Sequence, residues 1–419
     1  MYKQYFKLAL QSIRENPLVS IISISGTALS IAMIMVVILL FQIKTANYAP
    51  ETKRNRMLYI QGTLVKQKNQ KMNNSSGMSA EVARECFYSL ETPEAVTAHV
   101  TEEKPVSLPG KRLFNNYQIK YTDSGFWSVF EFQFINGKPF GYDDFSSGLC
   151  VAVVSEKLAR EVFGTTDVIG KTCILDFTEY TIRGVVKNVT EAATDAYAEI
   201  WVPYSSKSSF MAINSYYENM TGSFEVIILA KKRSDFKSIE EELLKRAASY
   251  NAGKNNNFIS FGEGPINKFD IATGSSWNRK VPVSTYLLST GSLLLFLLLI
   301  PTLNLTGVIQ SSIQKRQEEI GIRKTFGASS GKILSQILYE NFILTLTGAL
   351  LGLVLSVFLL WLCKSFLLSG QTQLTPGMLL KPAPFIITLI FTFLLNILSS
   401  GIPAFQMSRK KIIDVLRNE

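Results

Sequence analysis

Two short segments resemble nucleotide-binding sequences, but neither has the spacing that this chemistry requires. A phosphate-binding loop needs a glycine, four residues and then Gly-Lys-Ser/Thr, so that backbone amides surround a phosphate. Residues 164–172, GTTDVIGKT, have five intervening residues, and we interpret them as a turn between a helix and a strand. Residues 368–371, LSGQ, lack one glycine of the LSGGQ signature of ATP-hydrolysing domains. We therefore expect a non-catalytic chain with no cofactor of its own.

Metal and nucleophile chemistry have no better support in the sequence. His99 is the single histidine, and no Cys or His lies at ligand spacing from it. We expect no metal site, and we expect His99 to be a surface or packing residue. Acidic pairs such as Glu102–Glu103 fit solvated faces. A disulfide between Cys150 and Cys173 stays open, although free buried thiols are favoured.

The most distinctive segment is a charged sequence between two apolar stretches, QKRQEEIGIRKTFGASSGKI at residues 314–333. Its charged residues alternate in sign at helical spacing and apolar residues lie among them: Glu318, Glu319, Arg323 and Lys324, with Ile320, Ile322 and Phe326. Gly327 and the small residues after it predict the end of the helix. The segment is either a connector that anchors the flanking spans or a docking helix for a cytoplasmic motor. The apolar residues favour docking, because a solvated connector would not need them.

Four apolar stretches position this segment. Of the 419 residues 47% are hydrophobic, and a helix needs about 20 apolar residues to cross a bilayer. The predicted spans are residues 18–43, 283–310, 337–363 and 385–407. The first has no charged residue, exceeds the apolar length of a signal peptide and lacks an obvious cleavage site, so we interpret it as an uncleaved anchor.

The distribution of basic residues predicts the topology. The net charge is +10, and twelve lysines and arginines lie before the first span, between the second and third, and after the fourth. The connection between the third and fourth spans has two, Lys364 and Lys381. The positive-inside rule then places both termini and the charged segment in the cytoplasm, and residues 44–282 outside. The basic charge needs no nucleic-acid partner.

Several residues in the predicted spans fit helix packing. Gly26 with Ser30, and Gly348 with Gly352, form small-xxx-small faces that permit close approach of helices. Residues 1–17 have an amphipathic pattern and predict a helix in the inner membrane interface, in contact with lipid.

The second span contains two further residues of interest. Pro301 should bend it. Asn304 is a polar group at membrane depth that we expect to face protein. A packing hydrogen bond and a transport role are equally open for Asn304.

The segment between the first two spans has a mixed α/β pattern. Ser155 predicts a helix N-cap and Gly164 a C-terminal stop. Gly/Ser/Asn-rich residues 69–79 and 251–257 predict mobile loops. Aromatic residues from Phe126 to Phe134 predict a packed core and not a ligand groove. The expected strands are residues 151–154, 180–186 and 224–230, and the expected helices are residues 155–164 and 235–248.

The charged segment closely resembles the cytoplasmic-loop motif of FtsX/MacB-type ABC transporter permeases, which runs roughly R-E-I-G-I-R-K-A-L-G-A. Gln317 stands where a basic residue is frequent, a mild departure. Downstream, Glu340 with Gly348 and Gly352 fits the family's E…G…G pattern. The matching residues of the loop are Glu319, Ile320, Gly321, Ile322, Arg323, Lys324, Gly327 and Ala328.

Other segments extend the resemblance over nearly the whole chain. Residues 121–140, YTDSGFWSVFEFQFINGKPF, and 151–164, VAVVSEKLAREVFG, are similar to the periplasmic core domain of MacB-like permeases. Residues 402–417, IPAFQMSRKKIIDVLR, resemble the family's closing pattern, although Ile413 or Asp414 stands where a proline is usual.

The resemblance implies an α-helical membrane protein with four transmembrane helices and a large mixed α/β extracytoplasmic domain inserted between the first and second. The implied segments are an interfacial helix at 1–17, spans at 18–43, 283–310, 337–363 and 385–407, a core domain at 44–282 (base about 44–118 and 222–282, inserted lobe about 119–221), a coupling loop at 311–336, a short outer loop at 364–384 and a cytoplasmic tail at 408–419.

The implied function is that of a multi-pass permease of the bacterial inner membrane, working as a homodimer or as a heterodimer with a related permease. Because the chain begins 17 residues before its first span, we expect ATP and Mg to be bound by a separate cytoplasmic ABC ATPase. ATP hydrolysis would move the outer domain by mechanotransmission for export or efflux. A periplasmic adaptor and an outer-membrane channel are further partners that such a system can use.

Two alternatives stay open within the resemblance. One is a lipoprotein-releasing permease of the LolC type, and the other is a signalling permease like FtsX that activates a cell-wall hydrolase. The residues assigned to the ATPase contact are Glu318, Glu319, Ile320, Gly321, Ile322, Arg323, Lys324, Phe326, Gly327 and Ala328. Those assigned to transmembrane packing are Gly26, Ser30, Pro301, Asn304, Glu340, Gly348 and Gly352.

Overall fold

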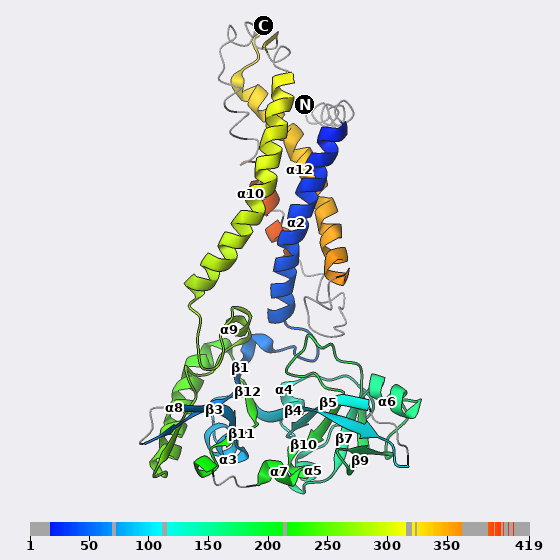
Figure 1. Ribbon diagram of the computed structural model, residues 1–419, viewed down its shortest axis with the longest axis vertical. Coiled ribbons are helices and arrows are strands. Elements are labelled where there is room, and N and C mark those ends of the chain that lie inside the picture. The colour runs from blue at the N-terminus through cyan, green and yellow to red at the C-terminus, as the bar shows by residue number, and fades with distance from the viewer. Residues whose placement is uncertain are drawn as a thin grey trace. The chain divides into compact units, whose positions relative to one another are not determined.

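The chain forms two compact units, and each is described by itself (Figure 1). The α/β unit comprises Ile43–Val283, and the helical unit is formed by the chain on either side of it. In this computed structural model the described residues are 17–68, 73–110, 115–212, 216–315, 321–322, 325–362, 384–388, 390–394, 397, 401 and 405.

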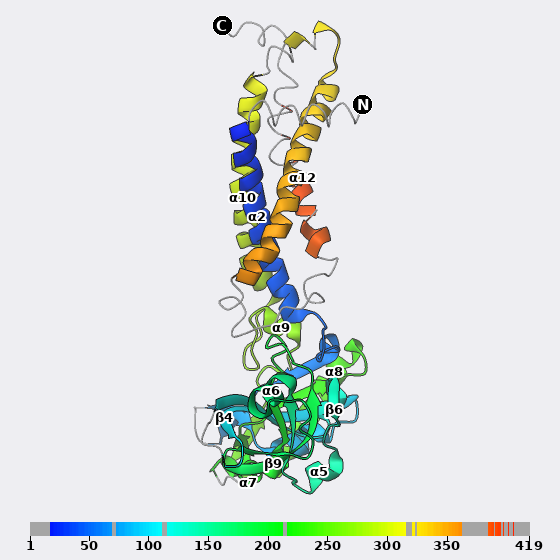
Figure 2. The same ribbon diagram turned by 90° about the vertical axis from the view of Figure 1, so that its right-hand side faces the viewer.

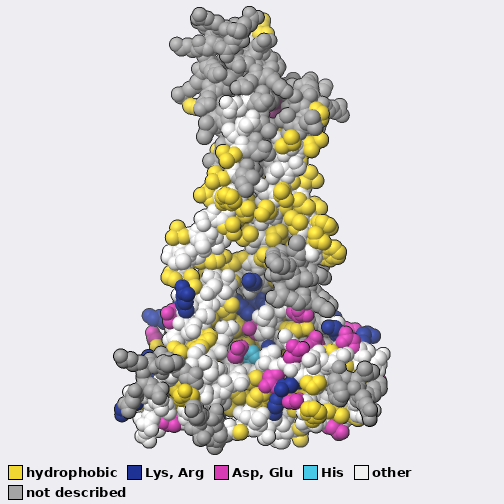
Figure 3. Space-filling view, viewed as in Figure 1, with side chains coloured by type: hydrophobic (Ala, Val, Ile, Leu, Met, Phe, Trp, Pro, Cys, Tyr) yellow, Lys and Arg dark blue, Asp and Glu magenta, His cyan; other side chains and the backbone are white. Residues whose placement is uncertain are grey.

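Three long helices dominate the helical unit: α2 (Pro17–Thr45), α10 (Val283–Lys315) and α12 (Ser330–Leu362). Among the described residues two helical stretches, Ser20–Thr45 and Gly331–Leu362, are long and apolar enough to cross a membrane. Val283–Leu297 and Pro384–Leu394 are shorter apolar stretches. Figure 3 shows hydrophobic side chains gathered on the surface of these helices, as lipid contact requires.

Some predicted segments lie wholly or partly outside the described residues. The interfacial helix, the short outer loop and the cytoplasmic tail are among them, with Cys363 and the LSGQ sequence. The fourth span is described in part, so the count of four spans stays a prediction.

The described residues of the α/β unit form two sheets, the larger with nine strands (Figure 2). Most neighbours in the larger sheet are antiparallel, but β10 with β5 and β7 with β9 are parallel. Its main path is β1 (Met57–Ile60), β12 (Glu225–Leu229), β4 (Ala95–Ser107), β5 (Asn115–Thr122), β10 (Ile200–Pro203), β7 (Val151–Ser155), β9 (Thr178–Val186) and β6 (Phe134–Gly137), while β8 (Thr172–Leu175) pairs with β4 and β9. The smaller sheet is β11 (Thr221–Gly222), β3 (Asn73–Met78), β2 (Thr63–Gln67) and β13 (Asn257–Ser260).

Short helices connect these strands, and two longer ones show how the sequence specifies them. In α6 (Glu156–Phe163) the Ser155 hydroxyl accepts a hydrogen bond from the Leu158 N–H at 3.2 Å, and Gly164 ends the helix at φ +75°. In α8 (Phe236–Ala252) the buried face repeats every four residues. The others are α3 (Ala80–Val82), the π-helical turn η2 (Ala83–Tyr88), α4 (Phe126–Val129), α5 (Tyr142–Ser146), α7 (Ser208–Met211), α9 (Lys268–Ala272) and the 3₁₀ turns η1 (Arg54–Arg56), η3 (Tyr204–Ser206), η4 (Tyr216–Asn219) and η5 (Arg233–Asp235).

The aromatic residues of 126–134 pack as a core, as predicted. Phe126 and Phe130 are fully buried, and Trp127, Phe132 and Phe134 pack against the same apolar cluster. The ring centroids of Trp127 and Phe132 lie 5.2 Å apart in an edge-to-face arrangement, which aromatic pairs prefer.

The predicted strands at 151–154, 180–186 and 224–230 are confirmed as β7, β9 and β12, and residues 164–172 form the predicted turn between α6 and β8. The two loop predictions are wrong in part. Strand β3 occupies residues 73–78, and α8 and β13 occupy parts of 251–257. The sequence of β3, NNSSGM, has weak strand propensity, but β2 and β11 pair with it on both sides and supply its hydrogen bonds.

The larger sheet runs through both segments assigned to the base and the lobe. The expected boundary near residue 118 falls within β5 (Asn115–Thr122). The division into base and lobe therefore stays a prediction, while the nine-stranded sheet is continuous across it.

Cys150 and Cys173 are free thiols. Cys173 pairs with Tyr180 of β9, and the Thr181 N–H of β9 donates to the Cys150 carbonyl at 3.0 Å from the other side. Two strand spacings, roughly 9–10 Å, therefore separate the cysteines. A disulfide requires Cα atoms within about 7 Å, so the open alternative of a Cys150–Cys173 disulfide is excluded.

His99 is buried on β4, with 4% of its surface exposed. The packing interpretation is confirmed, and the surface alternative is wrong. Burial holds the pKa of His99 well below its usual value, because the charged form would lose hydration, and the nearby Lys120 and Lys268 add to this effect.

Candidate functional site

The predicted coupling segment contains an exposed apolar turn between α10 and α12. The Phe326 N–H donates to the Ile322 carbonyl at 3.2 Å, so these residues are four apart on one helical face. Ile322 is 53% exposed and Phe326 is 88% exposed. Gly327 ends the turn at φ +86°, a backbone conformation that glycine adopts without strain. The predicted helix break is confirmed, and we call residues 321–328 the coupling turn.

Five of the predicted ATPase-contact residues lie outside the described residues. They are Glu318, Glu319, Ile320, Arg323 and Lys324. Of the rest, Gly321 is buried and Ala328 is half-buried. The described part of the coupling turn therefore presents two apolar side chains to solvent, a feature of surfaces that bind a partner.

The coupling turn has no hydrolase geometry in its described part. Residues 327–331, GASSG, match the G-x-S-x-G pattern of a nucleophile elbow. An elbow requires a strand before the turn and a helix after it. Here helical residues precede the turn and α12 follows it, so the pattern is coincidental.

Gly348 and Gly352 of α12 lie directly against α2. A Cβ atom on Gly348 would come within 2.9 Å of the Thr27 Cβ, and one on Gly352 within 2.7 Å of the Ala28 carbonyl oxygen. Each position therefore permits only glycine at this helix separation, as small-xxx-small packing requires. Gly26 is half-buried and Ser30 is buried. The residues of α2 that approach the two glycines are Ile24, Thr27, Ala28 and Ile31.

The remaining predicted packing residues lie on α10 and α12. The helix α10 continues through Pro301 and Asn304, whose side chains are outside the described set, so a bend and a packing role stay predictions. On α12 the Gln336 side-chain amide donates to the Glu340 carboxylate at 2.9 Å, an i, i+4 contact. The rings of Phe41 in α2 and Tyr286 in α10 stack at 5.9 Å.

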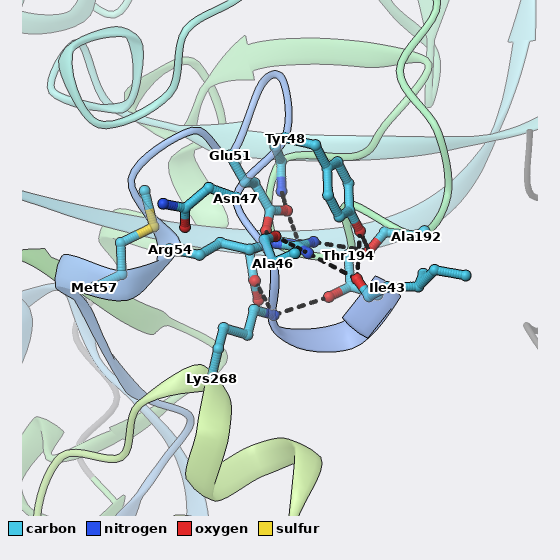
Figure 4. Close-up of polar contacts among 12 residues, drawn as sticks. Ile43, Ala46, Asn47, Tyr48, Glu51, Arg54, Met57, Ala192, Thr194 and Lys268 are labelled. Carbon is cyan, nitrogen blue, oxygen red and sulfur yellow. Dashed lines mark hydrogen bonds and ion pairs between the residues drawn. The ribbon is translucent and has the colours of Figure 1, made fainter. Parts of the chain in front are cut away.

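A buried cluster of charges lies where α2 enters the α/β unit (Figure 4). Arg54 is 1% exposed, and its Nη1 donates to the carbonyl oxygens of Ile43 at 3.0 Å and Ala46 at 3.1 Å. Its Nη2 donates to the Ala192 carbonyl at 2.9 Å, and its Nε forms an ion pair with Glu51. The guanidinium also lies 4.0 Å from the centre of the Tyr48 ring. Hydrogen bonds thus fix Arg54 on all three nitrogens.

Glu51 connects Arg54 to the loop between β9 and β10, residues 187–199. Its second carboxylate oxygen accepts hydrogen bonds from the backbone N–H groups of Asp195 and Ala196, each at 3.0 Å. The Glu51 carboxylate is fully buried, and all its described contacts are donors. Such contacts offset the cost of removing a charge from water.

Lys268 of α9, in the C-terminal part of the α/β unit's sequence, completes the cluster. Its ammonium forms an ion pair with Asp195 and donates to the Thr194 hydroxyl at 3.2 Å. The Lys120 ammonium of β5 donates to the Asp195 carbonyl at 2.6 Å. Burial favours the neutral acid, but the positive charges of Lys268, Lys120 and Arg54 outweigh it and hold the pKa of Asp195 below its usual value. Burial lowers the pKa of Lys120 to about 8.

Sequence reasoning missed this cluster. Glu51 and Arg54 stand three residues apart just after the first span, and Asp195 is an isolated acid among alanine and threonine residues. These two features of the sequence were the signals that could have indicated the cluster. Nothing in them indicates that segments more than 130 residues apart meet.

The described part of the chain thus has a helical unit with apolar helices, an α/β unit inserted after its first helix and an exposed turn between later helices. Residues 20–246 match the family "MacB-like periplasmic core domain", and residues 291–412 match "FtsX-like permease C-terminal". The chain belongs to the MacB/FtsX-type ABC transporter permeases. These are membrane-embedded transport components with a periplasmic domain, and they normally work with an ABC ATPase.

Curated relatives are distant in sequence but align over most of this chain. The chain is 24% identical over 355 residues to the uncharacterized ABC transporter permease YknZ of Bacillus subtilis, covering 83% of each protein. It is 24% identical over 320 residues to the macrolide export ATP-binding/permease protein MacB of Escherichia coli K12, covering 73% of this chain and 45% of MacB. The chain thus spans a little under half the length of MacB.

Two solved structures show weaker similarity. The extracellular domain of YknZ from Gram-positive bacteria aligns with 48% of this chain and 99% of its own length, at 17% identity and a TM-score of 0.36. The periplasmic region of MacB from Actinobacillus actinomycetemcomitans aligns with 52% of this chain and 94% of its own length, at 16% identity and a TM-score of 0.35.

Proposed function

We propose that this chain is the transmembrane permease subunit of a MacB-like ABC transporter. It couples ATP hydrolysis by a separate cytoplasmic ATPase to movement of its periplasmic α/β unit, for export or efflux. The coupling turn carries the proposal, because Ile322 and Phe326 are exposed within the family's loop motif. ATP and Mg belong to the partner ATPase.

Chain continuity supports transmission of movement in this proposal. The helix α2 is unbroken from Pro17 to Thr45, and its last turn begins the α/β unit at Ile43. The helix α10 starts at Val283, where the α/β unit ends, and runs to Lys315. A displacement at the coupling turn therefore reaches the α/β unit through α10, and through α12 and α2 by their close packing.

The assembly and topology are part of the same proposal. Both termini and the coupling turn lie in the cytoplasm of a bacterial inner membrane, as the basic residues predict. Two permease chains, identical or related, form the transporter with the ATPase, and an adaptor and an outer-membrane channel extend it for efflux. The MacB relatives are named for macrolide export, which makes macrolide-like compounds the first cargo to test.

The test uses the full chain, purified with its ATPase from its native membrane and reconstituted in lipid vesicles. Arg323→Glu should reduce permease-dependent ATP hydrolysis at least tenfold while membrane insertion stays normal. Lys332→Glu is the matched control, because Lys332 is exposed in the first turn of α12 and outside the motif. Unchanged ATPase coupling in Arg323→Glu would contradict the assignment. Recovery of a cell-wall hydrolase as partner would favour signalling, and recovery of a lipoprotein chaperone would favour lipoprotein release.

A further inference from the structure

We propose that Glu51, Arg54, Asp195 and Lys268 form a rigid joint that transmits movement of α2, and of the chain before α10, to the β9–β10 loop. This inference rests on the proposed function and assigns positioning residues to it. We call these four residues the joint. All of them lie within the α/β unit.

The joint holds the end of α2 through its free carbonyl groups. The last carbonyls of a helix have no partner within the helix. Here the Ile43 carbonyl accepts from Arg54 Nη1 at 3.0 Å, and the Tyr48 hydroxyl lies 3.0 Å from the same oxygen. A cation at this end also interacts favourably with the helix dipole.

The same two side chains reach the β9–β10 loop. The Ala192 carbonyl accepts from the Tyr48 hydroxyl at 2.7 Å and from Arg54 Nη2 at 2.9 Å. Arg54 therefore bridges the two backbone carbonyls with both Nη atoms, and the Tyr48 hydroxyl, which has one proton to donate, lies within hydrogen-bond distance of both. Two points of attachment restrict sliding and rotation between the helix end and the loop, whereas a single contact would act as a pivot.

The chain before α10 meets the same loop through Lys268. Lys268 precedes the start of α10 by 15 residues, and its ammonium pairs with the Asp195 carboxylate. The Asp195 backbone N–H donates to Glu51, which in turn pairs with Arg54. The end of α2 and the start of α9 are therefore connected to one loop by alternating charges.

Stability alone is a poor explanation for these charges. Apolar residues of similar volume often replace a buried ion pair without loss of stability. Apolar contacts have no preferred direction, however, whereas a planar guanidinium with five donors fixes the geometry of each partner. Transmission of movement needs that fixed geometry.

The test follows ATP-dependent movement by amide hydrogen exchange of residues 187–199 in the full transporter. Wild-type protein is compared with and without ATP and orthovanadate, which trap a nucleotide-bound state. We expect a change of exchange rate in the loop in wild type, and at least a fivefold smaller change in Arg54→Met, with ATP hydrolysis retained. Arg54→Lys should be intermediate, because an ammonium has three donors on one nitrogen, whereas Arg54 holds three carbonyls and Glu51 from three separate nitrogens.

A matched control separates transmission from folding. Arg183→Met removes the ion pair of Arg183 with Asp144, at 2.8 Å, which joins β9 to α5 and touches neither helix end. This variant should keep the full change. Lys268→Met serves as a second joint variant if Arg54→Met fails to fold. A wild-type-sized change in the joint variants overturns the joint alone, whereas a wild type without any ATP-dependent change overturns the proposed function and the joint with it.

Discussion

The coupling turn and the joint differ in almost every structural respect. Ile322 and Phe326 of the turn are four residues apart and exposed, whereas Arg54 and Glu51 of the joint are buried and reach a loop about 140 residues away. A docking partner can contact only what a surface presents, so the docking residues must be exposed. A transmitting site must hold separate segments together, so its residues are dispersed.

The largest expected effect is a loss of stability caused by a substitution in the joint. Asp195→Asn leaves Lys268 buried without its counter-charge, and the free energy of unfolding should fall by about 3–5 kcal/mol. Phe326→Ala in the exposed turn should change it by less than about 0.5 kcal/mol. Thermal unfolding of both variants in detergent measures the difference. Equal losses of stability in the two variants would contradict the contrast between a buried joint and an exposed coupling turn.

The next effect concerns the packing of α12 against α2. Gly352→Val places a side chain against the Ala28 carbonyl oxygen, and overpacking of this kind costs about 1–3 kcal/mol. Gly291→Val in α10 is the control, because a Cβ there meets nothing within 4 Å in the described part of the chain. Thermal unfolding in detergent should show a loss for Gly352→Val alone. A similar loss for both variants would contradict close packing at Gly352.

The free energy of unfolding should depend on pH through Lys120, which lies beside the joint. Burial lowers the pKa of Lys120 from 10.5 to about 8, so the unfolded chain binds more protons between these values. Stability therefore rises with pH in this window, by up to about 1.4 kcal/mol per unit from this group. Unfolding of wild type and Lys120→Met from pH 8 to 10 measures it. The rise should be smaller in the variant, and identical slopes would show that Lys120 titrates normally.

The smallest expected effect is a loss of stability at Ser155, which tests whether transmission of movement depends on stability alone. Ser155→Ala removes the cap of α6 and should cost about 1 kcal/mol, because the Leu158 N–H loses its acceptor. Ser234→Ala, at an exposed turn, is the control. ATP-dependent exchange in the β9–β10 loop should be normal in both. Loss of that exchange in Ser155→Ala would show that transmission merely follows stability.

The contrast between local contacts and contacts that are distant in sequence also explains which features can be predicted from the sequence. The ends of α6 and the break at Gly327 are local, since Ser155, Gly164 and Gly327 act through neighbouring backbone atoms. Strands β7, β9 and β12 are also predictable, because β-branched residues concentrate in them. The family motif is the basis of the function proposed for the coupling turn.

Other features depend on contacts that are distant in sequence. Strand β3 is polar and forms because two neighbours pair with it. The partners of Arg54 are mostly backbone carbonyls, which every residue has, so no residue pattern marks them. The sequence therefore does not mark Arg54 as unusual. Its burial becomes evident only from the folded structure.

The central claim is that an ABC ATPase docks on the coupling turn. Phe326 and Phe177 are a matched pair, since they are 88% and 86% exposed and Phe177 lies in the β8–β9 turn of the α/β unit. A photo-reactive phenylalanine analogue at each position, with the full chain in its native membrane, tests the claim. We predict a cross-link from position 326 to a protein with Walker A and LSGGQ sequences, and none to it from position 177. Absence of that ATPase at position 326, or equal capture at both positions, would contradict the account.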